Sequence, residues 1–570
     1  MHRRIACQRD LTLAGPAQCD FLSHERATDA AGRRAPGPRD TVKRAIGALP
    51  RCGLRVAGTC IRALAALAAA LLAGCTSLPS LDGRSTTFAA VDTDATRLGR
   101  AVAASAVNHP EMTGVRALPL GSDAFAARVI LADAAERTLD LQYYIWHGDT
   151  TGYLLLEHVR RAAERGVRVR LLLDDANTGG LDDVIAALEL EPNVQVRLYN
   201  PLMHRSARAL DFVLDFERVN RRMHNKAFIA DNQVAILGGR NVGDEYFGAG
   251  DDVAFRDLDA VVAGAAVHAV SREFDLYWNS PSAYPAGSVL AAARSTTEAR
   301  LDDRFAQARA GPDAVAYLQA VRDTPLLREI MARALNLEWT GAKLVHDDPA
   351  KTLDTQSRPD LLLLSDLLRI MGRPRASFDL VSPYFVPGDN GTAALVGLAR
   401  EGVTVRVLTN SLASTDVAFV HAGYAKRRCE LLRAGVRLYE VKPSNEDAEK
   451  AARQTLGASA TTRLHAKTFA SDGRRIFIGS FNFDPRSAHL NTEMGLIIES
   501  PSLAGQLSRA FADDVPRYAY EVRPTSGPGC MEWIDHTTSG DVHYDTEPGT
   551  TAAQRALIDL LSALPIDWLL

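Results

Sequence analysis

The sequence has few cysteines and few aromatic residues, and its N-terminal apolar run is too short to cross a membrane. Seven cysteines in 570 residues exclude a disulfide-rich scaffold. Aromatic residues make up 6%, hydrophobic residues 46% and charged residues 24%. This is ordinary globular composition, so a disordered or collagen-like chain is excluded. The length allows at least two cores of usual domain size.

The short apolar run resembles the core of a signal peptide. Residues 63–73 are 11 uncharged Ala and Leu residues that follow Arg55 and Arg62, whereas a membrane span needs about 20. The run ends in Leu72-Ala73-Gly74-Cys75, which is similar to a bacterial lipobox. We therefore interpret 1–74 as a signal peptide region, Cys75 as a lipidated residue and 75–115 as a tether. The alternative is a buried Ala/Leu helix that happens to end in cysteine.

The region before this run is too long for a signal peptide. Sixty-two residues precede the run, and Met1 is the only methionine before Met112. We interpret this excess as a spurious extension from an upstream start site. If the extension is absent and Cys75 is lipidated, only Cys429 and Cys530 remain in the folded body. An oxidising compartment permits a disulfide between them but does not imply one.

Charge is distributed unevenly along the chain. Residues 1–74 hold 12 Lys and Arg against 5 Asp and Glu, and the remaining residues hold 53 against 64. The main body therefore carries a net charge of −11. A nucleic-acid partner is disfavoured, because such proteins gain affinity from clustered basic side chains.

The body of the chain predicts an α/β fold made from a duplicated unit. Strand-like runs at 139–146 and 167–173 flank a helical stretch, an order that predicts a largely parallel sheet. Ala-Glu-Arg-Gly-Val-Arg-Val-Arg at 163–170 is matched by Ala-Arg-Glu-Gly-Val-Thr-Val-Arg at 399–406, an offset of 236. Val-Arg-Leu-Tyr at 196–199 recurs at 436–439, an offset of 240. Nearly equal offsets indicate one unit that was copied.

The repeats predict the domain organisation. We expect a first domain at 116–285, a second at 366–525 and a C-terminal extension at 526–570. Residues 286–365 are interpreted as a linker with added helices that has no counterpart in the other half. Helical runs are expected in and just after this linker, at 314–321, 326–335 and 361–371. The apolar run 552–570 is expected to dock on its parent domain rather than enter a membrane interface.

One motif occurs in both copies. The first is His224-x-Lys226-x4-Asp231-x6-Gly238-Gly239-x-Asn241, and the second is His465-x-Lys467-x4-Asp472-x6-Gly479-Ser480-x-Asn482. Histidine and lysine two apart on a strand face the same side. The glycine turn allows close backbone approach, and asparagine adds an amide donor. Two such half-sites facing each other would suit a phosphodiester.

This motif resembles the signature of the phospholipase D superfamily. The flanking sequences at 222–226, 238–247, 382–387 and 481–487, with the closing Trp568-Leu569-Leu570, are similar to bacterial cardiolipin synthases of the C-type. The resemblance implies two duplicated α-β-α sandwich domains with one active site at their pseudo-two-fold interface. Typical cardiolipin synthases carry two N-terminal transmembrane helices, and this sequence has a lipobox-like segment instead.

The resemblance also implies a two-step transfer. One histidine forms a phosphohistidine while the other donates a proton to the leaving alcohol, and an alcohol or water then releases the product. His224 is the expected nucleophile and His465 the acid/base, although the symmetry makes this assignment reversible. Lys226, Lys467, Asn241 and Asn482 would stabilise charge on the phosphate.

Supporting roles are expected for four carboxylates. Asp231 and Asp472 are expected to hold the architecture. Glu493 fits the carboxylate that orients a histidine in the family, and Asp257 aligns with it at offset 236. An ordinary carboxylate at a strand edge is the alternative for the last two.

Further candidates are an arginine cluster, a helical pair and two aromatic flanks. The cluster could hold an anionic head group or form a solvated loop: Arg205, Arg208, Arg218, Arg221 and Arg222. His421 and Tyr424 are expected near the site, with a surface helix as the alternative. Residues 143–146 and 384–387 could line its mouth or belong to the core. No zinc spacing or Walker loop is present, so no metal or cofactor is expected.

The leading functional prediction is a phosphatidyltransferase that makes cardiolipin from phosphatidylglycerol and a second phospholipid. A phospholipase D hydrolase is the alternative, since it shares the intermediate and differs only in using water. A nuclease is disfavoured by the acidic body. A non-catalytic lipid-binding lipoprotein would be expected to lack at least one motif histidine or lysine. The expected partners are phospholipids and a membrane, without nucleic acid, in the bacterial cell envelope facing the periplasm.

Overall fold

The computed structural model describes residues 77–249, 253–290, 298–332, 335–354, 358–443, 461–525 and 529–564. The chain divides into two units, Met1–Cys75 and Thr76–Leu570, and the described residues belong to the second. The predicted signal peptide, Cys75 and the closing residues 568–570 lie outside the described residues. No helix in the described part of the chain is both long and apolar enough to cross a membrane.

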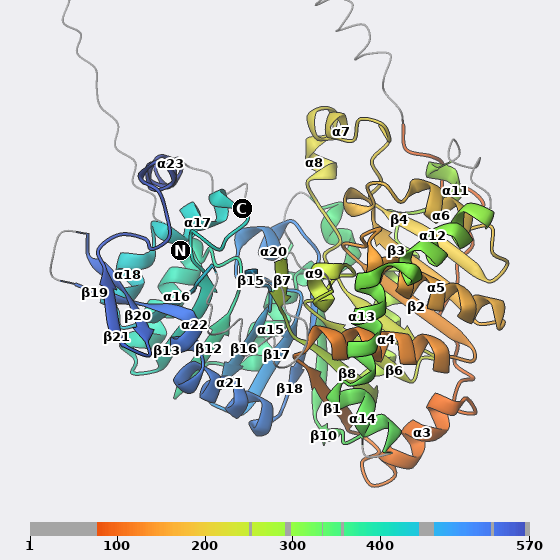
Figure 1. Cartoon of the computed structure of the whole chain (residues 1–570), viewed down its shortest axis with the longest axis horizontal. Coiled ribbons are helices and arrows are strands. Elements are labelled where there is room, and N and C mark those ends of the chain that lie inside the picture. Colours follow the sequence, from red (N-terminus) through yellow and green to blue (C-terminus); the bar gives the residue numbers. More distant parts are fainter. Residues whose placement is uncertain are drawn as a thin grey trace, which may run out of the picture. The chain divides into compact units, whose positions relative to one another are not determined.

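The first half contains a nine-stranded sheet, on the right in Figure 1. Its order is β10-β1-β8-β6-β5-β2-β3-β4-β9. The strands are β1 Thr113–Leu118, β2 Thr138–Tyr143, β3 Arg168–Asp174, β4 Val194–Tyr199, β5 Ala227–Ala230, β6 Val234–Gly238, β8 Asp259–Gly264, β9 Ala283–Pro285 and β10 Glu338–Thr340.

The second half contains a ten-stranded sheet with the same central order. This order is β11-β18-β17-β16-β12-β13-β14-β19-β20-β21. The strands are β11 Ala342–His346, β12 Ser377–Val381, β13 Thr404–Asn410, β14 Arg437–Val441, β16 Thr468–Ser471, β17 Arg475–Gly479, β18 Met494–Ile498, β19 Ala519–Pro524, β20 Met531–Thr537 and β21 Gly540–Tyr544. The matching order agrees with the duplication expected from the sequence.

The expectation of a largely parallel sheet is wrong. Only β2-β3-β4 and β12-β13-β14 are parallel, and the other pairs within these two sheets are antiparallel. The motif causes the difference, because each copy folds as a tight hairpin, β5-β6 or β16-β17, and a hairpin is antiparallel. Within these two sheets, parallel pairing is confined to the segments joined by helical crossovers.

Helices cover both sheets. Those of the first half are α3 Arg97–Ala106, α4 Gly121–Ala134, α5 Thr150–Glu164, α6 Asp182–Leu188, α7 Ala209–Leu214, α8 Phe216–Val219, α9 Asp244–Phe247, α10 Val267–Trp278 and α11 Ala286–Val289. The connecting region holds α12 Glu298–Ala310, α13 Pro312–Arg322 and α14 Pro325–Met331. The second half holds α15 Leu363–Met371, α16 Gly388–Arg400, α17 Ala418–Ala425, α18 Arg428–Arg433, α20 Pro485–His489, α21 Pro501–Asp513, α22 Val515–Tyr518 and α23 Ala552–Ser562. Short 3-10 turns are η1 Asp175–Asn177, η3 Pro349–Thr352 and η4 Pro359–Leu361.

The repeated helix-to-strand turn has a local cause. Gly166 follows α5 with φ +92°, and Gly402 follows α16 with φ +88°. Glycine adopts this left-handed conformation without steric cost and ends a helix. The apolar residues that follow then enter the central strands β3 and β13.

The two halves share a hydrophobic core. Ile229, Ala235 and Leu237 of the first half belong to the same buried cluster as Ile478 and Leu496 of the second. Four of these side chains project from the two hairpins, and Leu496 projects from the neighbouring strand β18, so the hairpins that carry the motifs pack near one another. The two motifs therefore lie within one unit.

Part of the predicted linker 286–365 has a counterpart in the first half, although the sequence analysis expected none. Strand β11 pairs antiparallel with β18, as β1 pairs with β8. Residues 342–346 therefore repeat β1 rather than belonging to an unmatched linker. Strand β10 instead extends the first sheet through β1.

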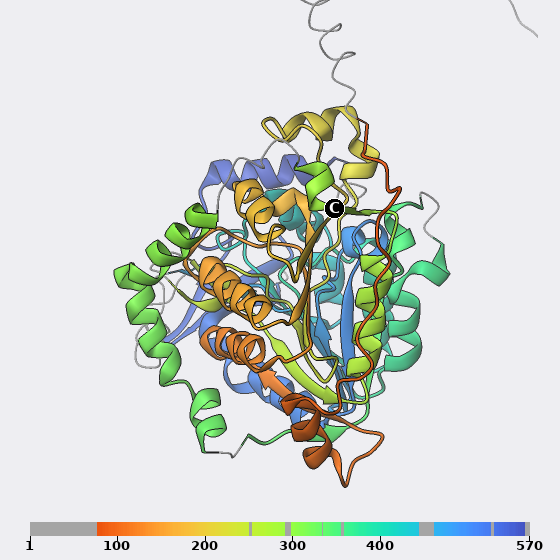
Figure 2. The same ribbon diagram turned by 90° about the vertical axis from the view of Figure 1, so that its right-hand side faces the viewer.

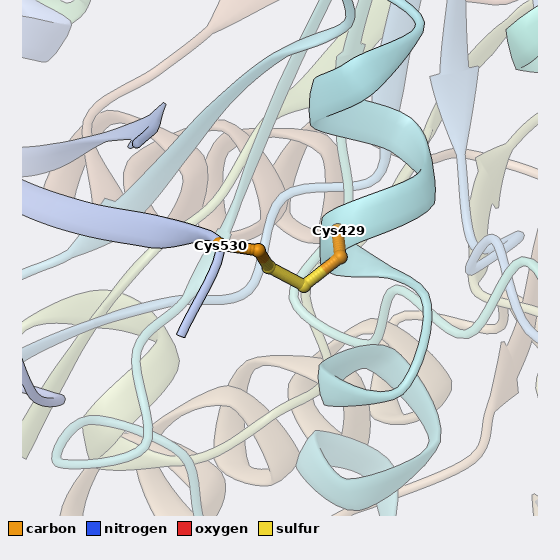
Figure 3. The surroundings of a disulfide bond; sticks show 2 residues. All are labelled: Cys429 and Cys530. Carbon is orange, nitrogen blue, oxygen red and sulfur yellow. A yellow bond between two sulfur atoms is a disulfide. The ribbon is translucent and has the colours of Figure 1, made fainter. Parts of the chain in front are cut away.

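The C-terminal region is fastened to the second half. The side chains of Ile558 and Leu561 in α23 pack with Leu412 and Ala422, as expected for a helix that docks on its parent domain. A disulfide joins Cys429 in α18 to Cys530, immediately before β20, with Cα atoms 6.1 Å apart (Figure 3). The sequence had left this pairing open.

Candidate active site

The two motif histidines are each held by a carboxylate from the other half. The Nδ1 atom of His224 lies 2.8 Å from Oε2 of Glu493. The Nδ1 atom of His465 lies 2.5 Å from Oδ2 of Asp257. A carboxylate at Nδ1 favours a proton on that nitrogen and leaves Nε2 free for chemistry. The halves are therefore crossed at the site.

Backbone contacts between the halves fix this crossing. The N–H of His224 donates to the carbonyl of Thr492 at 2.9 Å, and the N–H of His465 donates to the carbonyl of Arg256 at 2.8 Å. Two short parallel strands, β7 Val253–Arg256 and β15 Thr461–Leu464, join the halves beside His465. The backbone N–H of each histidine thus bonds the residue that directly precedes its carboxylate, Thr492 before Glu493 and Arg256 before Asp257.

The residue after the first motif glycine supports each carboxylate. A Cβ on Gly239 would lie 2.1 Å from Oδ1 of Asp257, so only glycine fits there. Ser480 holds the matching position, and its hydroxyl donates to Oε2 of Glu493 at 2.5 Å. The Gly-Gly turn of the first motif therefore stands beside Asp257, and the Gly-Ser turn of the second motif stands beside Glu493.

Both motif lysines are buried beside the histidines. The Nζ atom of Lys226 donates to the carbonyl of His224 at 2.6 Å, and Nζ of Lys467 donates to the carbonyl of His465 at 2.5 Å. Burial lowers the pKa of Lys467 to about 8 and that of Lys226 well below its usual value. These ammonium groups lack the solvation that water would provide, so an anion in the site would stabilise them.

The histidine pKa values are lowered in the same way. Burial, followed by repulsion from Lys467, lowers the pKa of His465 to about 4. Burial, followed by repulsion from Lys226, lowers the pKa of His224 well below its usual value. Both imidazoles are therefore neutral near pH 7 when no anion is bound. A neutral imidazole has the lone pair that a nucleophile requires.

The pKa values of the two carboxylates are shifted in opposite directions. Burial raises the pKa of Glu493 to about 7. Burial also disfavours the charge on Asp257, but His465 and Lys467 hold its pKa well below the usual range. Asp257 is therefore fully ionised at neutral pH, whereas Glu493 is divided between its two forms. The histidines have different electrostatic support.

The motif asparagines retain hydrogen-bonding capacity. The side-chain oxygen of Asn241 accepts from the N–H of Ile145 at 3.1 Å, but its buried Nδ2 has no partner within the described residues. The buried Oδ1 of Asn482 also has no partner there. Buried amides are usually satisfied, so these atoms mark positions where a substrate could bind.

The motif aspartates cap backbone away from the imidazoles. Asp231 accepts from the N–H groups of Arg137 at 2.7 Å and Thr138 at 3.0 Å. Asp472 accepts in the same way from Ala376 at 2.7 Å and Ser377 at 3.1 Å. Each side chain thereby fixes the loop that enters a central strand.

Three buried acidic residues that the sequence analysis did not single out support the histidines. The carboxylate of Asp347, just after β11, accepts from the N–H of Glu493 at 2.8 Å. Asp174, at the end of β3, accepts from the N–H of Met223 at 2.9 Å. Glu273 accepts from Asn225 at 2.6 Å, and burial raises its pKa to about 8. Their spacing from the motifs gives no signal, because tertiary packing alone brings them near.

The arginine cluster makes internal contacts in this structure. Arg205 contacts Asp175 and Asp182, and Arg208 contacts Asp182. Arg222 pairs with the buried Asp174. Arg218 pairs with Asp215, and Arg221 donates to the carbonyls of Lys351 and Asp354. These contacts fasten the segment that leads to His224.

Aromatic residues flank both histidines. The ring of Tyr144 lies 4.7 Å from that of His224, and the ring of Tyr246 lies 5.2 Å from that of His465. Tyr384 donates to Asp416. By contrast, Tyr143, Trp146, Phe385 and Val386 are core residues. Of the aromatic residues predicted to line a mouth, only Tyr144 and Tyr384 are partly exposed.

The expected helical pair forms a buried network with the C-terminal extension. His421 contacts Glu547 at 2.9 Å, and Glu547 also contacts Arg428. Tyr424 packs on Phe385, with ring centroids 5.5 Å apart. His421 and Tyr424 are both almost fully buried. They therefore do not lie on the exposed face of a surface helix.

One group of side chains in the described residues could hold a cation. His147, Asp149 and Glu245 each offer one ligand atom, and these atoms lie within 4.8 Å of one another. All three are partly exposed, and Glu245 pairs with His147 at 3.1 Å. Such groups are common in proteins without a metal, and the contacts of His224 and His465 described above do not involve them.

Comparisons with known proteins identify the family of the chain. A family model described as "Cardiolipin synthase, PLD-like domain" matches residues 129–278 and 367–515. The chain is 44% identical to cardiolipin synthase C of Escherichia coli over 83% of this chain and 100% of that protein. It is 24% identical to a cardiolipin synthase of Listeria monocytogenes over 71% of this chain and 69% of the other.

A solved structure gives independent support for the fold. The crystal structure of phosphatidylserine synthase from Haemophilus influenzae is 14% identical, with a TM-score of 0.51 over 83% of this chain and 99% of that one. At this identity the likeness concerns the fold alone. The duplicated motif, the two matched domains and the similarity to E. coli cardiolipin synthase C show that the chain belongs to the cardiolipin synthase family of phospholipase D-like proteins.

Proposed function

We propose that the chain is a phosphatidyltransferase that makes cardiolipin from phosphatidylglycerol and a second phospholipid. The crossed pairing of two histidines with two carboxylates, in a buried site that also holds both motif lysines, carries this proposal. It supports one shared site in which one imidazole attacks and the other transfers protons. Membership of the cardiolipin synthase family supports the choice of phospholipid substrates.

In the first step, Nε2 of neutral His224 attacks phosphorus and the bond from phosphorus to the leaving alcohol breaks. His465 donates its Nε2 proton to the departing oxygen. In the second step, His465 takes the proton of an incoming lipid hydroxyl, whose oxygen attacks phosphorus as the bond to His224 breaks. A bound phosphodiester anion raises both imidazole pKa values, which allows His465 to enter the cycle protonated.

The difference between the carboxylates supports this assignment of roles. An acid/base histidine becomes cationic in the cycle, so it benefits from an ionised partner. Asp257 is fully ionised, whereas Glu493 has a pKa raised to about 7. His465 is therefore the better proton carrier and His224 the nucleophile. Lys226, Lys467, Asn241 and Asn482 are assigned to the phosphate oxygens.

We also propose that the protein is a lipoprotein attached through Cys75 to a bacterial membrane, with its body in the periplasm. The lipobox-like segment before Cys75 supports attachment, and the disulfide between Cys429 and Cys530 supports an oxidising compartment. The two catalytic domains are assigned to 116–285 and 366–525.

Mass spectrometry of the lipid products tests the proposed reaction. Phosphatidylglycerol vesicles incubated with the full chain should yield cardiolipin as the main product. Water is present at about 55 M, so transfer requires a pocket that holds the lipid acceptor at high effective molarity. A predominance of phosphatidic acid would replace the synthase with a hydrolase. Absence of both products from a folded sample would refute the proposed chemistry.

A further inference from the structure

Two groups of exposed apolar side chains lie on helices beside the candidate site. The first is on α7 and α8 and consists of Leu210, Phe212, Val213, Leu214 and Phe216. Val213 is 77% exposed. Five large apolar residues within seven positions are unusual on a free surface. We call this group the α7 patch.

The second group lies on α17, on α23 and just after α23, and consists of Phe419, Leu557, Leu560 and Leu564. The inward side of α23 is already covered, because Ile558 and Leu561 pack with residues beside and within α17. Leu560 remains 62% exposed on the outward side. We call this group the α23 patch.

Contacts connect the α7 patch to the site. Asn220, which follows α8, accepts from Arg486 at 2.6 Å, and Arg486 lies near enough to His224 to lower its pKa. Asn200 accepts from Arg218 in α8, and its own Nδ2 donates to the carbonyl of Arg221 beside the motif. The α7 patch therefore projects from the segment that enters the first motif.

The α23 patch is connected to the site from the second half. Tyr384 interacts electrostatically with Tyr144 and Tyr246, whose rings contact the two imidazoles. Tyr384 also donates to Asp416, which in turn interacts with Lys467 of the site. Phe419 follows Asp416 by three residues, at the start of α17. The two patches consequently flank the site from different halves. Figures 1 and 2 show α7, α8 and α23 toward the same end of the described unit.

The first described segment of the chain begins toward this same end. Its red trace starts near α7 and α8 in both views and then runs toward α3 (Figures 1 and 2). Arg84 in this segment lies near Tyr284, as does Arg218 of α8. Two peptide links separate Ser77 from Cys75, which corresponds to at most about 8 Å of chain. A lipid on Cys75 would therefore hold a bilayer against this end.

We propose that the α7 and α23 patches insert into the surface of a phospholipid bilayer and place the candidate site over its lipids. This inference rests on the proposed function and on the proposed attachment at Cys75. A bilayer suits two separate patches that flank one site, because lipids can surround each helix and reach the space between them. Apolar side chains on such helices bind membranes by removing apolar surface from water.

Tryptophan fluorescence in the full chain tests this placement without requiring activity. Full-chain variants that carry Val213→Trp or Leu560→Trp are each bound to vesicles of phosphatidylcholine and phosphatidylglycerol whose acyl chains are brominated. Met331→Trp is the matched control, because Met331 is 79% exposed on α14 at the opposite end. Bromine should quench the added fluorescence at 213 and 560 but not at 331. Equal quenching at all three positions, or at none, would overturn the proposal.

Activity measurements separate this proposal from the proposed function. Phe212→Ser combined with Leu560→Ser should lower turnover on vesicles by about 100-fold, since each of the two apolar side chains withdrawn from lipid is worth about tenfold. Turnover of dispersed short-chain phosphatidylglycerol should be unchanged. Unchanged turnover on vesicles would refute the docking surface while leaving the synthase intact. Quenching at 213 and 560 without any cardiolipin would support docking and refute the synthase.

Discussion

The two halves share one scaffold but differ at the residue that follows the first motif glycine. In the first half Gly239 allows Asp257 to approach closely, and Asp257 also accepts from the N–H of Leu258 at 2.7 Å. In the second half Ser480 donates to Glu493, whose Oε1 has no partner in the described part of the chain. The better-satisfied carboxylate has the lowered pKa. A duplicated site can therefore acquire two unequal histidines through its supporting residues.

Each carboxylate contacts the histidine of the other half, so neither half holds a complete site. Each histidine is oriented by the other half, so separation of the halves would release both imidazoles. This arrangement makes the shared core between the hairpins part of the catalytic geometry.

The largest expected effect is the loss of either histidine. His224→Ala and His465→Ala should each lower turnover by about 10⁴-fold or more, because each removes one of two groups that act in sequence. Turnover is measured by mass spectrometry of lipid products, with the exposed His543→Ala as control. Near-normal turnover in either folded site variant would mean that one half works alone.

The disulfide should make the second half more dependent on oxidation than the first. Cys429→Ser should lower the free energy of unfolding by about 3 to 5 kcal/mol, because the bond closes a loop across 101 positions. Thermal unfolding with and without reductant measures this difference, and Ser539→Ala provides an exposed control. A reductant that leaves the wild-type unfolding temperature unchanged would contradict a stabilising bond.

The two orienting carboxylates should differ in importance. Asp257→Asn should lower turnover by about 100-fold and Glu493→Gln by about tenfold, since residues that orient a catalytic imidazole have effects in this range. Asp257→Glu tests whether the close approach to Gly239 matters. Steady-state kinetics should show the loss in kcat, with unfolding temperatures as controls. The reverse order would exchange the proposed roles of the histidines.

The pH dependence should distinguish the same pair. The pKa of Glu493 is raised to about 7 by burial, so its ionised form increases as pH rises through that value. An ionised Glu493 accepts the Nδ1 proton more strongly and makes Nε2 of His224 more nucleophilic, so turnover should rise through pH 7. Glu493→Gln should remove this inflection, whereas Asp257→Asn should retain it. An inflection that persists in Glu493→Gln would assign it to another group.

The smallest expected effect is that of a chelator. Lysine and asparagine donors supply the charge stabilisation in the proposed mechanism, so EDTA should leave turnover unchanged. Loss of activity that zinc or magnesium restores would contradict this site. Substitution of His147 by Ala would then show whether the cluster with Asp149 and Glu245 holds the ion.

The sequence alone determined the duplication, the two motifs and the family resemblance, because these depend on spacing along the chain. It also predicted that Asp257 and Glu493 would support histidines. It did not predict which carboxylate serves which histidine, since the crossing depends on how the two halves pack. Asp347, Asp174 and Glu273 were not identified for the same reason.

The antiparallel pairing and the disulfide were likewise decided by tertiary structure. The strand pattern gave the positions of β2 and β3, but apolar periodicity does not encode the direction of a neighbouring strand. The cysteines are separated by 101 positions, and only tertiary packing brings α18 beside the residue that precedes β20. Local residue patterns specify elements and reactive groups, whereas long-range packing specifies partners and therefore the electrostatics of the site.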